Sequence, residues 1–514
     1  MKNKIRSYIM VLGCLLVAGS GCSKFDDINT NPDRPAEVSS SMLATTLLLN
    51  ITRDAISTQK SFMQNYMLGK YILWTEFAEN QQYNKFSRTS FDGFIVLNNV
   101  DKMIEFAPDE GQKKSYTALG HFIRAWKFFN ASMEVGDIPY SVALAGESEN
   151  VINPEYDSQK EVFEGILNEL DEADRLFSEG TNFSGDPVYN GNVAKWRKLV
   201  NSFELKVLIN LYKKTADPAL KVKERFQQIV SSRPVFTSNA DNFALQYSDK
   251  AGQKYPFFKE GNQFIIYQMV SDVLIDRLKE TEDYRLFYFT KPSPVKIAGG
   301  KTWSDWDAYV GIDPSVVYSD LSAISSSKDF SAINDRYTQI PSGEPVALIS
   351  YAQVKFMMAE AALRGWITGD GAAKYYEDGI RASMEFVVQY TPDDANYHHN
   401  RKIDAAYIQN FLLSDKVKLQ GTTPEQLEQI ITQAYIANFL QAPYSAYFEY
   451  RRTGYPAFPI NPASNKNIPS DRIPIRWLYP QKELDYNGEH VNSAISSQYG
   501  GNDDVNAPMW ILKD

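Results

Sequence analysis

Three aromatic residues stand at regular three-residue spacing in a glycine-rich segment of the chain. The segment reads GGKTWSDWDAYVG and contains Trp303, Trp306 and Tyr309, with Asp305 and Asp307 between them. Flat rings beside carboxylates suit the apolar faces and the hydroxyl groups of sugars. The same rings could instead pin the segment onto a scaffold, and the sequence leaves both interpretations open.

A second group of aromatic and amide side chains lies where a helical pattern gives way to a polar loop. The stretch YILWTEFAENQQYNKFSRTSFDGF supplies its members, which are Trp74, Asn80, Gln81, Gln82, Tyr83 and Phe86. Amide groups beside rings form a plausible rim for a polar ligand, although the rings could equally serve the core. We treat the members of both groups, except Gln82 and the two aspartates, as candidate ligand-binding residues.

The four histidines do not form a catalytic or metal-binding set. His121 lies within an apolar helical pattern, which predicts a histidine packed in the core. His398 and His399 are adjacent, and neighbouring residues point to different faces of a helix or strand, which disfavours a shared metal ion. His490 lies in a polar tail. The sequence has no Gly-x-Ser-x-Gly elbow, phosphate-binding loop or His-Glu-x-x-His helix, so we predict neither a metal nor a cofactor.

Two carboxylate pairs match a glycosidase site in residue type alone. They are Glu76 with Glu79, and Asp305 with Asp307. Glycosidases need a defined separation between their two carboxyl groups, and sequence provides none. Because an acidic chain contains many such pairs, we predict a protein that is not an enzyme and keep a surface glycosidase as an alternative.

The composition of the 514-residue chain excludes further classes of function. It has 53 Lys and Arg against 63 Asp and Glu, a net charge of −10, and no basic run that would follow a phosphate backbone. Nucleic acid is therefore not an expected partner. The two cysteines are Cys14 and Cys22, which excludes a disulfide framework or a cysteine-based zinc site in the rest of the chain.

The N-terminus has the pattern of a bacterial export signal. A basic start is followed by an apolar stretch that is too short to span a bilayer, and then by Gly19-Ser20-Gly21 before Cys22. This resembles a lipoprotein signal peptide over residues 1–21, with lipid attached to Cys22. Residues 22–40 are polar, as expected of a tether, and their Asp26 and Asp27 resemble the acidic signals of surface-exposed lipoproteins.

Most of the remaining chain has the apolar periodicity of helices. Apolar residues recur every three or four positions over 115–133, 161–177, 193–214, 351–366, 372–390 and 424–452. Asp157 or Ser158 is placed to cap the helix that covers 161–177. Period-two alternation is confined to short pieces near 286–289 and 334–339.

Two of these helices form a recognisable pair. Within 351–390, small residues allow close approach and Gly365, Gly369 and Gly371 break the connection, as in a tetratricopeptide unit. We therefore predict an all-α fold of tetratricopeptide-like helical pairs. Two long irregular segments, about 290–345 and 453–514, are rich in Gly, Pro, Ser and Asn and are expected to pack on one face of this scaffold.

Several stretches together resemble the SusD/RagB family of outer-membrane nutrient-binding lipoproteins, in its SusD-like branch. They occur in the family's order over nearly the whole mature chain, and include FDDINTNPDRP, RAWKFFNASMEVGDIPYS, YDSQKEVFEGILNELDEA, VKFMMAEAALRGW and IITQAYIANFLQAPYSAYFEYRRTGYP. The resemblance implies one SusD-like helical domain over 41–514 whose looped face carries the ligand site. It also implies a non-enzymatic protein that lies over a SusC-like TonB-dependent transporter.

The leading hypothesis is a lipid-anchored protein of the outer membrane, exposed at the cell surface, that captures oligosaccharides and passes them to the transporter. The alternatives are a peptide-binding subunit of the same kind of complex, or a structural lid without its own ligand site. The paired arginines Arg451 and Arg452, close to Glu449, are expected to lock the C-terminal loops through ion pairs and carbonyl bonds rather than to bind ligand.

Overall fold

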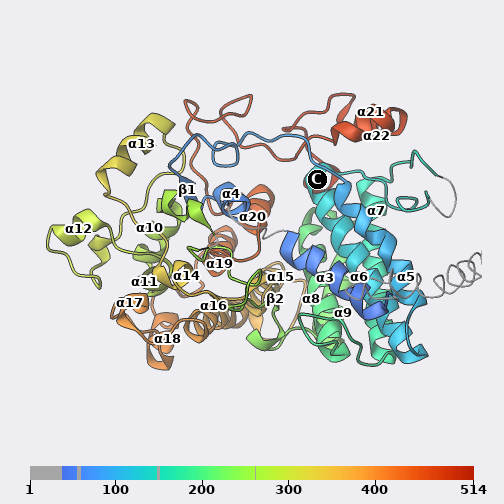
Figure 1. Cartoon of the computed structure of the whole chain (residues 1–514), viewed down its shortest axis with the longest axis horizontal. Helices are drawn as coiled ribbons and strands as arrows, with labels where there is room; N and C mark the ends of the chain where they lie inside the picture. Colours follow the sequence, from blue (N-terminus) through green and yellow to red (C-terminus); the bar gives the residue numbers. More distant parts are fainter. Residues whose placement is uncertain (1–37, 55–59, 147–150, 261) are drawn as a thin grey trace, which may run out of the picture.

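The computed structural model describes residues 38–514, except 55–59, 147–150 and 261 (Figure 1). The expected signal peptide, Cys22 and nearly all of the tether lie outside the described residues. Within the described part, no helix combines the length and apolar character needed to cross a bilayer.

The described chain is mostly helical. Its α-helices are α3 (Ser40–Asp54), α4 (Lys60–Leu68), α5 (Asn99–Glu105), α6 (Glu110–Val135), α7 (Gln159–Glu179), α8 (Val193–Asn210), α9 (Val222–Ser232), α10 (Asp272–Glu280), α11 (Arg285–Phe289), α12 (Pro294–Ala298), α13 (Tyr318–Ser327), α14 (Asp335–Thr338), α15 (Tyr351–Leu363), α16 (Gly371–Gln389), α17 (Ala395–His398), α18 (Ala405–Leu412), α19 (Thr423–Ala437), α20 (Ser445–Thr453), α21 (Gln481–Tyr486) and α22 (Gly488–Tyr499). Short 3-10 turns, η1 to η6, cover Asp92–Asn98, Tyr212–Lys214, Asn239–Asp241, Gln263–Tyr267, Trp306–Ala308 and Trp510–Leu512.

The longest helices pack as antiparallel neighbours and confirm the predicted helical pairs. Helix α6 packs along α7, and α7 packs on α8, while α15 packs along α16 and on α19. Gly365, Gly369 and Gly371 all have positive φ at the turn between α15 and α16, a conformation that glycine adopts without strain. Gly379 of α16 lies so close to Phe356 that a Cβ atom there would sit 2.7 Å from the ring.

Local sequence signals explain where these helices begin. The N-cap of α7 is Ser158, whose side chain accepts a hydrogen bond from the backbone N–H of Glu161, while the Glu161 carboxylate accepts one from the backbone of Ser158. This capping box satisfies backbone donors that the first turn would leave unpaired.

The stretch 424–452 is predicted as one helical pattern, but it forms two helices, α19 and α20, because residues 438–444 turn between them.

Four short strands form two antiparallel pairs. Strand β1 (Ile72–Trp74) pairs with β3 (Gln268–Val270), so that Trp74 faces Gln268, and β2 (Phe243–Leu245) pairs with β4 (Val346–Ile349). Residues 286–289 and 334–339, where the sequence shows alternation, lie mostly in α11 and α14 instead. All four residues of β4 are buried, so its sequence could not alternate between polar and apolar residues.

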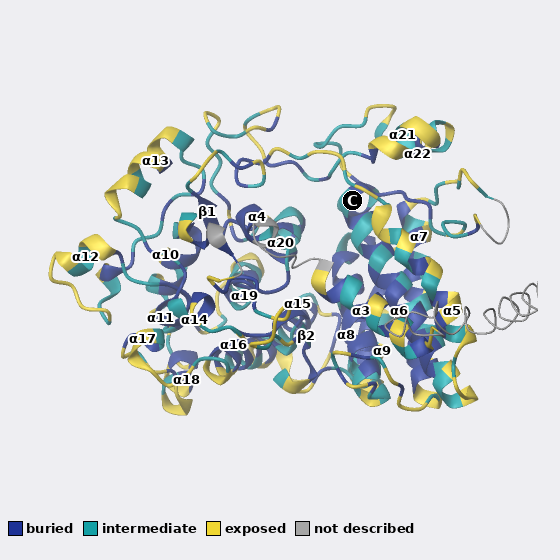
Figure 2. Cartoon of the chain, in the orientation of Figure 1, coloured by how far each residue is buried: buried dark blue, intermediate teal, exposed yellow. Residues whose placement is uncertain are grey.

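The two irregular segments contain more helix than the sequence suggests. Residues 290–345 include α12, α13 and α14, and residues 453–514 include α21 and α22. In Figure 1 the second segment runs along the upper edge of the molecule, while α12 and α13 project at the left. Figure 2 shows that buried residues concentrate where the long helices meet, and that exposed residues lie on these outer segments and on the outward faces of the helices.

Candidate functional site

Trp303 is the most accessible ring of the candidate ligand-binding residues. Its side chain is 42% exposed, in the loop that connects α12 to η5. One edge of the indole lies against His399, with ring centroids 5.6 Å apart and planes at 77°. The rest of the ring is free to stack on an apolar surface, such as the face of a sugar.

The loop that carries Trp303 is fixed by Arg401. The Nε and Nη2 atoms of Arg401 both donate to the backbone oxygen of Ser304, at 3.0 and 2.8 Å. Its Nη1 atom donates to the hydroxyl of Tyr284 at 3.1 Å, and its guanidinium lies over the ring of Phe287. A ring held in this way loses little conformational freedom when a ligand binds, which favours affinity.

Trp306 and Tyr309 hold the loop rather than face outward. Trp306 packs against Phe287, with ring centroids 4.8 Å apart. Tyr309 is fully buried; its hydroxyl donates to the backbone oxygen of Trp303 at 2.7 Å and lies 2.9 Å from Nδ1 of His399. Burial lowers the pKa of His399 to about 4, so this ring is neutral at pH 7. Of the two interpretations left open by the sequence, anchoring applies to Trp306 and Tyr309, and exposure applies to Trp303.

In the second group, the rings of Trp74 and Tyr83 are buried, and that of Phe86 is partly buried. Trp74 is fully buried, because pairing of β1 with β3 places its indole against Tyr267. Tyr83 is buried and its hydroxyl donates to the backbone oxygen of Val316. Phe86 packs on Trp477, with centroids 4.5 Å apart. Trp74 and Tyr83 therefore hold this loop from inside, and Phe86 keeps part of its surface accessible.

Asn80 and Gln81 of this group and one neighbouring ring remain accessible, whereas Gln82 is buried. Asn80 is exposed, and its Oδ1 atom accepts a hydrogen bond from Lys466 at 3.3 Å. Gln81 lines a cavity that is described below. Phe77, which the sequence reasoning passed over, is 43% exposed and touches Trp74 edge to face. It follows the short strand β1 by three residues, and no sequence pattern marks it.

A buried lysine anchors the same loop from below. The ammonium group of Lys70 donates to the backbone oxygen of Gln82 at 2.6 Å and to Oδ1 of Asn84 at 2.7 Å. Burial lowers the pKa of Lys70 to about 7, since removing an ammonium group from water disfavours its charged form. The loop between β1 and η1 is therefore fixed on a residue that precedes β1.

A cavity of about 400 Å³ lies between the helical pairs and the C-terminal helices. Its walls come from α3, α4, α6, α8, β4, α20 and the turn before α20, and Gln81 also lines it. We call it the central cavity. In Figure 1, α4 and α20 face α6 and α8 across the middle of the molecule. Its volume is within the range of small-molecule sites.

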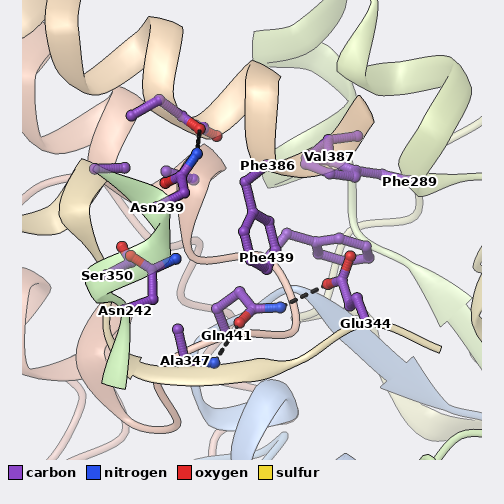
Figure 3. A pocket seen from close by; sticks show the side chains of 14 residues that line it. Asn239, Asn242, Phe289, Glu344, Ala347, Ser350, Phe386, Val387, Phe439 and Gln441 are labelled. Atoms are coloured by element: carbon purple, nitrogen blue, oxygen red, sulfur yellow. Dashed lines mark hydrogen bonds between the residues drawn. The ribbon is translucent and has the colours of Figure 1, made fainter. Parts of the chain in front are cut away.

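A smaller cavity between β4 and α16 has room for about one water molecule. Its volume is about 20 Å³, and it is lined by Asn242, Phe386 and Gln441, among others (Figure 3). The Nδ2 atom of Asn242 is buried and has no hydrogen-bond partner among the described residues. This cavity is therefore too small for a nutrient molecule.

Charged residues elsewhere on these loops have structural partners. Arg452 is buried and forms ion pairs with Glu360 at 2.5 Å and with Glu449 at 2.5 Å. Arg451 donates to the backbone oxygens of Met133 and Ile475. Arg451 thus holds a C-terminal loop at Ile475, as predicted, whereas Arg452 joins α20 to α15; both belong to the last turn of α20 rather than follow it.

The candidate catalytic groups also occupy structural positions. Glu79 is buried and accepts a hydrogen bond from Gln64 at 3.1 Å. Asp305 accepts one from the backbone N–H of Thr302, which lowers its pKa. His121 is only partly buried, contrary to prediction, and pairs with Glu169. In the part of the chain that the structure describes, no three His, Cys, Asp or Glu side chains are arranged to hold a metal ion.

The helical pairs, with anchored loops that present an accessible ring, define a class of protein: a helical-repeat binding protein. A family model described as "Starch-binding associating with outer membrane" matches residues 32–480. The chain belongs to this SusD-like family. Its members bind nutrients at the outer membrane and are not enzymes, so the glycosidase alternative is rejected.

Solved structures agree with this assignment. A SusD homologue from Bacteroides fragilis is 47% identical, with a TM-score of 0.89, over 93% of this chain and 100% of its own. An outer membrane protein of Bacteroides vulgatus, described as involved in nutrient binding, is 34% identical with a TM-score of 0.81, over the same shares. A chitin-binding protein, 22% identical over 92% of this chain and 100% of its own, shares the fold with a TM-score of 0.73. No curated protein matches the sequence.

Proposed function

We propose that this protein is a lipid-anchored, surface-exposed subunit of an import complex, which captures oligosaccharides and passes them to a SusC-like TonB-dependent transporter. In this proposal residues 1–21 are removed as a signal peptide, Cys22 carries the lipid, residues 22–40 are the tether, and residues 41–514 form one ligand-binding domain. The leader sequence supports the anchor, and membership of the SusD-like family supports the outer-membrane location.

The oligosaccharide part of the proposal depends on one observation, the presentation of Trp303. Its ring is accessible, and Arg401 and Tyr309 hold its loop through the backbone oxygens of Ser304 and Trp303. Carbohydrate C–H groups pack on such a ring, while nearby polar groups bind the hydroxyls. The carboxylate of Asp307 is exposed close to Trp303 in the sequence and suits the second role.

Isothermal titration of the purified protein tests this proposal. Starch and chitin oligosaccharides are the first probes, because the family description and one structural relative refer to these polymers. A panel of short neutral peptides is titrated in parallel. We expect binding of at least one oligosaccharide, and a loss of at least tenfold in affinity in Trp303→Ala. The control is Tyr486→Ala on α21, which removes an exposed ring at 79% exposure from another part of the surface.

Each other outcome has a definite meaning. Binding of peptides alone would replace the oligosaccharide proposal with the peptide-binding alternative. No binding by either class, with transport still dependent on the protein, would favour a structural lid. Equal losses in Trp303→Ala and Tyr486→Ala would remove Trp303 from the site.

A further inference from the structure

The central cavity presents polar groups from one face of helix α6. Trp126, Asn130 and Glu134 follow one another at four-residue spacing, which places them on the same side of the helix, and all three line the cavity. The side-chain nitrogen of Asn130 donates to the backbone oxygen of Trp126, which leaves its side-chain oxygen as an acceptor. Glu134 accepts a hydrogen bond from the hydroxyl of Thr89.

Helix α8, beside α6, contributes an ammonium group that the described residues leave without an acceptor. Lys206 of α8 lines the cavity, and its Nζ atom lies 6.0 Å from the centre of the Trp126 ring. No hydrogen bond or ion pair joins this ammonium to any residue that the structure describes. Glu449, the carboxylate whose charge acts on Lys206, is held by Arg452 at 2.5 Å. Burial lowers the pKa of Lys206 to about 8, so at neutral pH the group is mostly charged.

The turn that closes the cavity is held in a strained conformation. Leu440, Ala442 and Tyr444 all have φ between 39° and 64°, a left-handed conformation that residues other than glycine rarely adopt. Two hydrogen bonds of the Gln441 side chain support this turn (Figure 3). Its amide nitrogen donates to Glu344, and its amide oxygen accepts from the backbone N–H of Ala347. Strain of this kind needs such support, and Tyr444 of the same turn lines the cavity.

We infer that the central cavity is a second binding site, which takes a small ligand by its carboxylate group. The carboxylate pairs with Lys206, the body of the ligand packs on Trp126, and the oxygen of Asn130 and the amide of Gln81 bind its polar groups. Lys127 and Glu134 of α6 line the same cavity. The volume of about 400 Å³ admits one or two sugar rings or a short peptide.

Two sources share the required chemistry, an acidic sugar and the C-terminus of a peptide. The experiment therefore titrates the detergent-solubilised full-length protein with digalacturonic acid and neutral galactobiose, and with triglycine and triglycine amide. We expect one of the two acids to bind at least tenfold more tightly than its neutral counterpart. The acid that shows this preference identifies the source.

Lys206→Met tests the assigned residue without endangering the fold. Its removal leaves no buried charge unpaired, because Glu449 keeps Arg452, and it relieves the cost of burying an ammonium group. We expect Lys206→Met to abolish the preference for the acid, and Lys223→Met, which removes an exposed lysine from α9, to retain it. Thermal melting of both variants checks folding.

The site is independent of the loop that carries Trp303. Trp303→Ala should therefore leave binding of the acid unchanged, so failure of the oligosaccharide proposal does not affect this test. Equal affinity for acid and neutral partner, no binding by either acid, or full binding by Lys206→Met would each overturn the inference.

Discussion

Lys70 shows how single buried side chains control the ligand-facing loops. Its ammonium group is removed from water in order to hold Gln82 and Asn84, and burial lowers its pKa to about 7. An unfolded chain would titrate this lysine near its ordinary value of 10.5. Between these two values the unfolded state binds more protons than the folded state, so the free energy of unfolding must rise with pH in this window.

The predicted rise of the free energy of unfolding with pH can be tested. We expect the free energy of unfolding of the wild-type protein to increase between pH 7 and pH 9.5 relative to that of Lys70→Met, by on the order of 2 kcal/mol. Urea denaturation at both pH values measures the difference. Since other groups titrate equally in both proteins, parallel stability profiles would show that Lys70 keeps an ordinary pKa.

The sequence can indicate the accessibility of a candidate binding residue only where that accessibility depends on the neighbouring residues in the chain. For Trp303 the sequence leaves exposure and anchoring open, and the structure shows an accessible ring in a glycine-rich loop. The burial of Trp74 has no local signal, because it depends on β3, almost 200 residues later in the chain. Arg401 carries no local signal either: it reaches Ser304 only after the chain has folded.

Among the helices, α7 offers the clearest test of how local sequence sets an element. Its Ser158–Glu161 capping box is complete. We expect Ser158→Ala to lower the free energy of unfolding by about 1 kcal/mol, because the first turn loses its side-chain acceptor. Ser178→Ala, an exposed serine at the other end of the helix, should change it by much less. Urea denaturation of the two variants measures both changes in the free energy of unfolding. Similar changes in the two variants would contradict the capping role of Ser158.

Long amphipathic helices were predictable, and short strands were not. In α7 and α16 the apolar residues recur over several turns, so the helical period remains recognisable even where single positions deviate from it. Strands of three or four residues contain too little pattern, and β4 is buried throughout. The short helices α12 and α21 have no buried face, and therefore leave no apolar period in the sequence.

For the molecule as a whole, the proposal rests on attachment through Cys22. We expect Cys22→Ala to shift the protein from the membrane fraction to the soluble fraction while its thermal melting temperature stays unchanged, because the proposed folded domain begins only near residue 41. The chain offers a matched control in Cys14→Ala, which alters the other cysteine within the proposed leader. Cell fractionation with immunoblotting measures both variants. Membrane retention of Cys22→Ala would refute lipid attachment at this residue.

The anchors of the loops share a property that bears on how new specificities arise. Lys70, Tyr83, Arg401 and Arg451 each donate to a backbone carbonyl oxygen of the segment that they hold. Every amino acid supplies such an oxygen, so exchange of the side chains on these segments leaves these bonds available. A scaffold built in this way permits its recognition surface to diverge by ordinary point mutation, without a matching change in the residues beneath.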